Sequence, residues 1–271
     1  MAAGYPEREI EVDEDGAVVV GGDAVVTLEA SREIAGLRRV ESELDDGEES
    51  FRQYRTHNLV DSGTISIVGY TGGSNALDAT MQTALSWAVA NYNTLPNVDL
   101  QFSLSYGAHT NADIVVYKVP GPGGGQAGFP AGGAPYKWVQ IQDGTSAYGT
   151  NVVEHVIGHE IGHTIGFRHT DYFNRSLSCG VGGDEGAGSV GANHIPGTPV
   201  GTDYDSIMQS CFSASEDGEL GTFDIVALEQ LYGGGTASCL DACGGFAGAC
   251  WCDDACSYYG DCCSDKVSMC G

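Results

Sequence analysis

The sequence predicts a mixed α/β domain with a small disulfide-rich module at its C-terminal end. Segments that alternate like strands are interspersed with segments that carry apolar residues at helical spacing. Eight of the ten cysteines lie between Cys239 and Cys270, a density typical of a small unit that disulfides hold together. A chain of 271 residues has room for one such domain and one such module.

The chain divides into three predicted segments: residues 1–57, residues 58–235 and residues 236–271. The first is acidic, with little sustained periodicity, and its acidic run at 41–49 is expected to be solvated. The second is expected to form the α/β domain. The third is the cysteine module, preceded by a linker of glycine and small residues from Gly233.

Strands and helices are predicted in alternation along the first two segments. The predicted strands are residues 18–20, 24–28, 64–70, 100–106 and 112–117, with an edge strand from Tyr136 to Ile141. The predicted helices are residues 75–93, with Ser74 as the N-cap, 151–165 and 222–231. The Gly/Pro-rich stretch 120–135 is predicted as a loop, and it lacks the Gly-Lys-Ser/Thr of a phosphate cradle.

Composition excludes several classes of function. The formal net charge of −26 would repel phosphates, which argues against nucleic acid as a partner. No run of 18 apolar residues is present, so no membrane span is expected. The first residues show no signal peptide. The cysteine density nevertheless indicates an oxidising, extracellular compartment.

A metal site is indicated between His159 and His169. Residues four apart share one face of an α-helix, so the imidazoles of His159 and His163 can grip one ion, with Glu160 beside its open side. Gly166 can take a left-handed conformation that ends the helix, after which the chain can deliver His169. Three neutral nitrogens leave a fourth position for water, as in a catalytic zinc site.

These residues resemble the metzincins, whose motif HExxHxxGxxH they match at all five fixed positions. His-Glu-Ile-Gly-His is similar to the bacterial dual-action HEIGH metallopeptidases in particular. The resemblance implies a metzincin-like fold with a mixed sheet, an active-site helix and a C-terminal helix. It also implies one catalytic zinc and a peptide or protein substrate. Glu160 would be the general base toward a metal-activated water.

A second metzincin element follows the third histidine. The sequence Ser206-Ile207-Met208 resembles the Met-turn of astacins, which implies that Met208 forms an apolar floor beneath the zinc without binding it. An ordinary core methionine is the alternative. Astacins continue with a histidine and a zinc-binding tyrosine, but Gln209 and Ser210 occupy those positions, so no tyrosine ligand is expected.

The remaining candidate ligands have less support. His155 lies one helical turn before His159, but no glutamate follows it, so it is expected on the helix face or beside the ligands. Asp171 is expected either to brace the loop by a hydrogen bond or salt bridge, or to be a plain turn residue. Three histidines have no supporting pattern: His57, His109 and His194.

By family resemblance, the substrate lies extended along an edge strand above the active-site helix. Residues 136–141 are the candidate, because an unpaired edge can add a peptide as a further strand. An ordinary solvent-facing edge is equally compatible with the sequence.

The first segment contains a weak match to a latency device. Gly22-Asp23 resembles part of the Phe-x-Gly-Asp segment of astacin propeptides, whose aspartate occupies the water position on zinc, with Val20 at the aromatic position. The resemblance implies a zymogen in which Asp23 caps the zinc until residues 1 to about 57 are removed. A simple turn aspartate is the alternative.

The C-terminal module has the cysteine spacing of a somatomedin-B domain, a family used in protein binding. Its cysteines are Cys239, Cys243, Cys250, Cys252, Cys256, Cys262, Cys263 and Cys270. Their spacing leaves the pairing open. Cys179 and Cys211 are expected to form a disulfide within the catalytic domain, two free buried thiols being the alternative.

Together these features predict a secreted zinc-dependent endopeptidase. The alternative is a secreted adhesion or inhibitor-binding protein that uses the somatomedin-B-like module and keeps a vestigial zinc site. Such a protein has no physical need for Glu160. A zinc deaminase would require cysteine ligands that are absent from the motif. Bound Ca²⁺ is compatible with so acidic a chain, but no EF-hand pattern supports it.

Overall fold

The structure is a computed structural model that describes most of the chain. The described residues are 5–12, 16–28, 53–188, 191–198, 203–233, 239, 243–245, 252–253, 256 and 266–270. The acidic run at 41–49, most of the predicted linker, and Cys250, Cys262 and Cys263 lie outside them.

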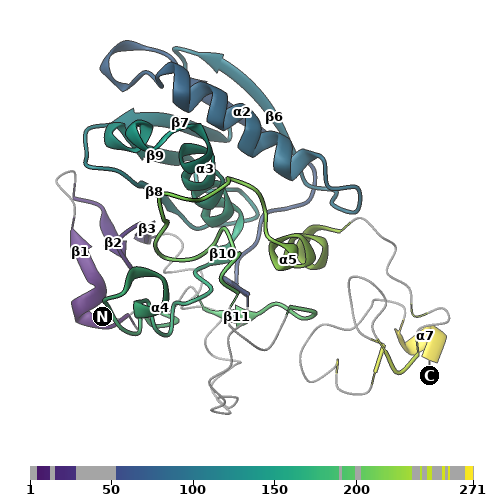
Figure 1. Ribbon diagram of the computed structural model, residues 1–271. Helices are drawn as coiled ribbons and strands as arrows, with labels where there is room; N and C mark the ends of the chain where they lie inside the picture. The colour runs from purple at the N-terminus through teal and green to yellow at the C-terminus, as the bar shows by residue number, and fades with distance from the viewer. Residues whose placement is uncertain are drawn as a thin grey trace.

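A mixed eight-stranded sheet is the framework of the α/β domain (Figure 1). Its strands are β1 (Ile10–Val12), β2 (Val18–Val20), β3 (Ala24–Val25), β5 (Thr64–Tyr70), β6 (Gln101–Gly107), β7 (Ile114–Val119), β8 (Gly125–Gly128) and β9 (Trp138–Gln142). Their order in space is β1-β2-β3-β8-β9-β7-β5-β6. The four consecutive strands β9, β7, β5 and β6 are parallel to one another, and β8 runs antiparallel to β9.

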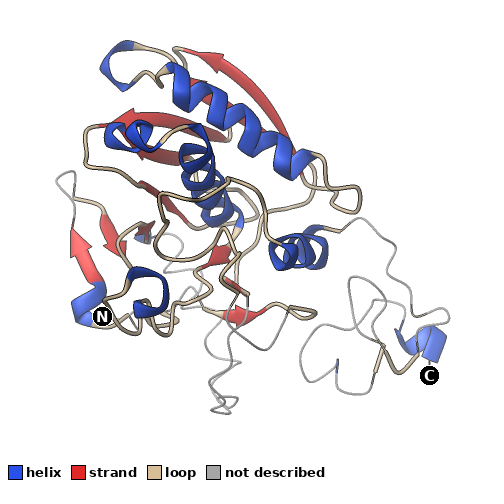
Figure 2. Ribbon diagram, viewed as in Figure 1, coloured by secondary structure: helices blue, strands red, loops and turns tan. Residues whose placement is uncertain are grey.

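Two helices, α2 (Ala79–Asn93) and α3 (Thr150–Ile165), pack against each other and against this sheet (Figure 2). The core between them is aliphatic, and Met81, Leu85 and Ile157 in the helices are fully buried against strand residues such as Ile67 and Ile141. Burial of this kind stabilises the fold by about 1.5–3 kcal/mol per large apolar side chain.

The prediction that Ser74 caps the first helix is wrong. Asp78 is the N-cap of α2, and its carboxylate accepts a hydrogen bond from the backbone of Met81 at 3.0 Å. Ser74 lies in a separate 3-10 turn, Gly73–Asn75. Apolar spacing located the helix, but Asp and Ser are comparable caps, so spacing could not choose between them.

The prediction that residues 136–141 form an edge strand is also wrong. The strand at this position, β9, lies inside the sheet between β7 and β8. The next strand outward, β8, falls in the Gly/Pro-rich stretch that was predicted as a loop. β3 of the acidic N-terminal segment pairs with β8 in parallel, so β1, β2 and β3 extend the sheet at this edge.

A second, three-stranded sheet lies beyond the C-terminal end of α3. Its order is β10-β4-β11, formed by β10 (Phe167–Arg168), β4 (Tyr54–Arg55) and β11 (Asn193–His194). Two further helices are α4 (Ser176–Cys179) and α5 (Thr222–Tyr232). The Tyr232 hydroxyl donates to the carbonyl of Ile165, which ties α5 to the end of α3.

Disulfides join the loops of the domain and of the C-terminal module. Cys179 bonds Cys211 across the region that follows α3. In the module, Cys239 bonds Cys252, and Cys243 bonds Cys270 of α7 (Lys266–Cys270). Every cysteine among the described residues is in a disulfide. No described helix has the length and apolar character needed to cross a bilayer.

Candidate metal centre

The end of α3 positions the three motif histidines. His159 and His163 lie one turn apart on the buried face of the helix. Gly166 ends the helix in the left-handed region with φ 112°, where a residue with a Cβ would be strained and would also meet Leu59. β10 then turns the chain back toward the helix, and it delivers the buried side chain of His169.

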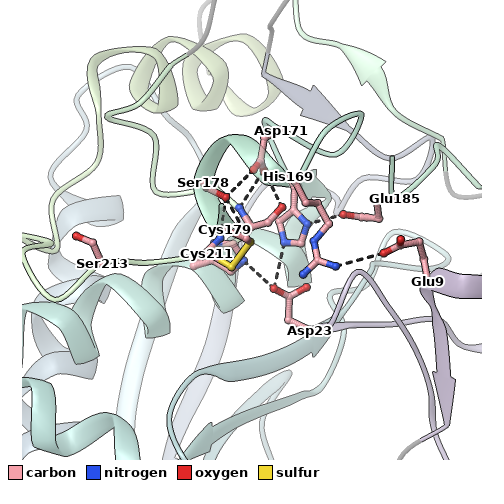
Figure 3. Close-up of a disulfide and its surroundings, with 12 residues drawn as sticks. Glu9, Asp23, His169, Asp171, Ser178, Cys179, Glu185, Cys211 and Ser213 are labelled. Carbon is pink, nitrogen blue, oxygen red and sulfur yellow. Dashed lines mark hydrogen bonds and ion pairs between the residues drawn. A yellow bond between two sulfur atoms is a disulfide. The ribbon is translucent and has the colours of Figure 1, made fainter. Parts of the chain in front are cut away.

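The three Nε2 atoms converge on one point, together with the carboxylate of Asp23. Nε2 of His169 lies 3.2 Å from Nε2 of His163 and 3.2 Å from Oδ2 of Asp23. The Asp23 carboxylate also lies 3.7 Å from Nε2 of His159 and 3.9 Å from Nε2 of His163. The four ligand atoms are all within 4.8 Å of one another. Figure 3 shows Asp23 facing His169 from the N-terminal segment.

The outer nitrogens of these imidazoles fix their tautomers. Nδ1 of His159 contacts the carbonyl of Ile207 at 2.7 Å, and Nδ1 of His163 contacts the carbonyl of Phe167 at 2.9 Å. A carbonyl can only accept, so both Nδ1 atoms carry the proton and both Nε2 atoms present a lone pair to the centre. This is the arrangement that outer partners impose on metal-binding histidines.

The donor atoms of this centre are suited to a bound cation. Burial and the two neighbouring imidazoles lower the pKa of His163 well below its usual value, so its ring is neutral. Burial also lowers the pKa of His169, but the carboxylates of Asp23 and Glu185 outweigh it and raise this pKa well above its usual value. Nε2 of His159 and Oδ1 of Asp23 are buried without a hydrogen-bond partner. One divalent ion would satisfy all of these atoms together, so the residues fit zinc.

Glu160 lines the same centre from the next position on α3. Its side chain is 2% exposed, and Oε2 has no hydrogen-bond partner. Burial, and then the charge of Asp23, raise its pKa well above the usual value. Gly125 of β8 makes room for it, because a Cβ there would lie 2.5 Å from Oε1 of Glu160. Strand β8 therefore has a glycine at position 125 because a larger residue would collide with Glu160.

Met208 packs beneath α3 and is 1% exposed. Its sulfur would lie 2.5 Å from a Cβ at Gly162, which explains the glycine within the histidine motif. The turn Ser206-Ile207-Met208 is held by Asp224 of α5. The Asp224 carboxylate accepts hydrogen bonds from the hydroxyl of Ser206 at 2.6 Å and from the backbone N–H of Ile207 at 2.8 Å. The same turn supplies the carbonyl that orients His159.

Glu185 is a site residue that sequence reasoning missed. Its carboxylate is fully buried between His169 and Arg168, with Oε2 2.6 Å from Nδ1 of His169 and Oε1 2.6 Å from the guanidinium. Burial alone would raise its pKa, but His169 and Arg168 lower it to about 2, so Glu185 is ionised. One acidic residue in a Gly-rich loop carries no spacing signal, so no sequence pattern could have assigned this role.

Arg168 holds that loop in place. Its buried guanidinium donates to the carbonyls of Gly186, Ala187 and Gly191 at 2.6–2.9 Å. Aromatic rings surround it: Tyr5, Phe129 and Tyr172 lie with their centroids 5.4–5.8 Å away. The arginine between Gly166 and His169 therefore organises the loop that carries Glu185, and Tyr5 of the N-terminal segment contributes to its enclosure.

Asp171 braces the turn after His169 by hydrogen bonds. Oδ1 accepts from the backbone and hydroxyl of Ser210 at 3.0 and 2.7 Å, and Oδ2 accepts from the hydroxyl of Ser178 at 2.6 Å. The Cys179–Cys211 disulfide lies beside this network (Figure 3). Ser210, at the position of the astacin tyrosine, is thus bonded to Asp171.

The other histidines lie outside the cluster of four ligand atoms. His155 is buried one turn before His159, with Nδ1 3.7 Å from a carboxylate oxygen of Glu216, and burial lowers its pKa to about 4. His57 contacts Asn193, and His194 contacts Thr198. His109 is exposed.

A cavity of about 270 Å³ adjoins the centre. Residues of the N-terminal segment, of the stretch before β8, of α3 and of the turn after Met208 line it. The lining residues are Gly21, Gly22, Asp23, Gly123, Gly124, Gly125, Gln142, His155, Val156, His159, Glu160, Arg175, Gln209, Ser210, Cys211 and Phe212. Asp23, His159 and Glu160 therefore border a space large enough for part of a bound chain.

The match to a known protein family agrees with this chemistry. A family model described as dual-action HEIGH metallo-peptidase matches residues 18–232. No curated protein matches the chain. Two solved structures of myroilysin match part of the chain. One has 14% identity, covers 64% of this chain and 82% of that one, and has a TM-score of 0.39. The other has 13% identity, covers 65% and 86%, and has a TM-score of 0.40.

Proposed function

Because this chain belongs to the dual-action HEIGH metallopeptidases, and is therefore a zinc metallopeptidase of the metzincin type, we propose that it is a secreted endopeptidase made as a latent precursor. In this proposal zinc is held by His159, His163 and His169, and Glu160 is the general base. The catalytic domain spans residues 58–235, after a propeptide-like segment of residues 1–57 and before a module of residues 236–271.

Two observations support the ligand assignment. The Nε2 atoms of the three histidines converge, and the Nδ1 atom of each ring contacts a carbonyl or carboxylate oxygen. His155 does not compete, because its ring nitrogens are not among the ligand atoms that converge, and its Nδ1 lies 3.7 Å from Glu216. A catalytic zinc site uses three protein ligands and leaves one position for water or substrate. Asp23 lies at that fourth position.

Glu160 is placed to move protons during peptide hydrolysis. Bound zinc would lower the pKa of a water ligand and polarise a carbonyl. Glu160 then takes the proton of the attacking water at its free Oε2 and passes it to the nitrogen of the leaving amine. Burial favours the first of these steps, because it raises the pKa of Glu160 and so makes its carboxylate a stronger base toward the water proton. The resulting carboxyl and amine products complete the cleavage.

The substrate would lie along β8, the strand nearest to Glu160. The edge of β8 that would accept a peptide is paired with β3 in the described structure. An extended peptide can form the same backbone hydrogen bonds once β3 has left. Gly125 places this strand in contact with Glu160, which brings the scissile bond of a peptide on β8 close to the general base.

Latency is supported by two contacts of the same segment. Asp23 faces the three histidines, and β3, which begins at the next residue, covers the edge of β8. His169 and hydrogen bonds from the neighbouring imidazoles hold the pKa of Asp23 well below its usual range, against the effect of burial. The ionised carboxylate can therefore occupy the water position until residues 1 to about 57 are removed.

Secretion is supported by the disulfides in both the domain and the module. The somatomedin-B-like assignment of residues 236–271 rests on cysteine spacing, and such a module would bind a protein partner. It would direct the enzyme to its substrate rather than take part in the chemistry.

Removal of the metal tests the proposed function. The processed enzyme is expected to cleave casein, to lose that activity with a zinc chelator such as 1,10-phenanthroline, and to regain it when zinc is restored. Added CaCl₂ alone is expected to restore nothing, because nitrogen ligands select zinc over calcium. Cleavage that continues in the presence of the chelator, with zinc absent by atomic absorption, would refute the proposal.

Glu185 is predicted to support the zinc ligand His169. Glu185→Ala is expected to weaken zinc affinity about 10- to 100-fold, the usual effect of losing such a partner. Glu185→Gln keeps an acceptor and should lose less. Zinc affinity is measured by competition with a fluorescent chelator, and Asp184→Ala, on the exposed side of the same loop, is the control. Equal affinity in all four proteins would show that Glu185 has no such role.

A further inference from the structure

Arg175 lies in the loop between His169 and α4 and borders the active-site cavity. Its backbone N–H donates to the carbonyl of Gly183 at 3.0 Å, which fixes the loop. Among the described residues that line the cavity, which include Asp23, His159 and Glu160, it is the only arginine or lysine. A permanent positive charge therefore lines the same cavity as Asp23, His159 and Glu160, in a chain with a net charge of −26.

The N-terminal segment provides a partner for only some of the N–H donors of the Arg175 guanidinium. Nη1 of Arg175 lies 3.3 Å from Oε2 of Glu9, and Nε is buried without a hydrogen-bond partner. The side chain is 19% exposed. A guanidinium has five N–H donors in a planar fork and pairs best with a carboxylate that reaches two of them. Glu9 belongs to the segment that would leave on activation, so its departure would free Arg175.

The position of Gly22 shows how close the guanidinium of Arg175 lies to the chain that carries Asp23. Gly22 directly precedes Asp23, whose carboxylate faces the three histidines. A Cβ built on Gly22 would lie 3.3 Å from Nη2 of Arg175. The space next to the residue that faces the histidines therefore adjoins the guanidinium, and Gly22, at φ 98°, leaves that space open.

We propose that Arg175 is a specificity-determining residue that binds an acidic side chain of the substrate adjacent to the scissile bond. The inference rests on the proposed endopeptidase function and on the removal of the N-terminal segment. Glu9 is then an internal stand-in for the substrate carboxylate. The overall negative charge does not override this contact, because salt screens distant charges over about 8 Å while a close, partly buried pair is screened much less.

Pairs of peptides that differ only in a carboxylate (Asp) or an amide (Asn) test whether Arg175 binds an acidic side chain. A fluorogenic peptide series carries Asp or Asn at each of six successive positions around the cut, and the processed wild-type enzyme is compared with Arg175→Gln and Arg175→Lys. Lys137→Gln is the matched control, since Lys137 lies over Trp138 and does not line the cavity. Cleavage of the all-neutral peptide reports folding and zinc loading in every variant.

At one position next to the cut, kcat/KM of the wild type is expected to be about tenfold or more higher for Asp than for Asn, the effect of one charge-assisted hydrogen bond. Arg175→Gln should bring that ratio close to one, Arg175→Lys should retain part of it, and Lys137→Gln should leave it unchanged. An Asp/Asn ratio that is the same in wild type and Arg175→Gln would overturn the proposal, as would the lack of an acidic preference at every position.

Failure of the endopeptidase function would look different, because no variant would then cleave any peptide. In that case the role of Arg175 is tested by binding. Fluorescein-labelled forms of the same peptides are titrated with each protein, and fluorescence anisotropy gives the Kd. An Asp peptide that binds wild type about tenfold more tightly than Arg175→Gln supports the role of Arg175. Equal Kd values for the two proteins refute it.

Discussion

Glu160→Gln is expected to lower kcat/KM for peptide hydrolysis by about 100- to 10,000-fold, the usual contribution of a general base, while zinc content stays at one per chain. Glutamine has nearly the same shape as glutamate but cannot accept the proton of the attacking water. Because the three histidines are unchanged, the metal site should remain intact. Initial rates on a fluorogenic peptide and zinc content by atomic absorption give both quantities.

The matched control for this variant is Glu154→Gln, the same substitution on the same helix. Glu154 is buried, but it accepts a hydrogen bond from Asn91 at 3.0 Å and does not line the cavity, so its replacement should leave kcat/KM nearly unchanged. Full activity in Glu160→Gln would refute the proposed mechanism. A processed wild type that binds zinc but cleaves nothing would instead favour the adhesion or inhibitor-binding alternative.

Asp23→Ala is expected to make the full-length chain active. Loss of the carboxylate removes a charge-assisted interaction of about 1.5–3 kcal/mol, so activity on a short peptide should rise roughly 10- to 100-fold. β3 still covers β8, so the gain should be smaller than that produced by removing the whole segment.

Glu11→Ala is the control for Asp23→Ala, because Glu11 is an exposed acidic residue of the same segment. It should leave the precursor latent. If Asp23→Ala is no more active than Glu11→Ala, while removal of the whole segment activates both, then coverage of β8 alone accounts for latency.

The parts of the fold that follow from local periodicity were predictable. The strand over residues 64–70 has the observed bounds, and the helix at 151–165 begins one residue earlier, at Thr150. The arrangement of the motif histidines was also predictable from the local sequence, because two histidines four residues apart share one helix face and Gly166 ends the helix before His169. The fold class followed from these local features, and the zinc peptidase activity followed from the resemblance of the motif to the metzincins.

The parts that depend on distant segments were not predictable. β8 has the composition of a loop, and it is a strand because β9 and β3 pair with it. Glu185 reaches His169 because Arg168 gathers its loop, and neither contact leaves a periodic pattern. The pairing of Arg175 with Glu9 spans 166 residues and is equally invisible in the sequence. Long-range contacts of this kind place polar side chains, Asp23 among them, around a centre whose three proposed histidine ligands are close in the sequence.

Anomalous diffraction at the zinc edge from crystals of the full-length protein is the most direct test of the site. One peak is expected at the convergence of His159, His163 and His169, at Zn–N distances of about 2.0–2.1 Å, with a carboxylate oxygen of Asp23 as the fourth ligand. In Asp23→Ala crystals a water should occupy that position, with the three histidines unchanged. Zinc bound through His155, or a peak without all three motif histidines, would contradict the assignment, and zinc beyond reach of Asp23 would refute the latency mechanism.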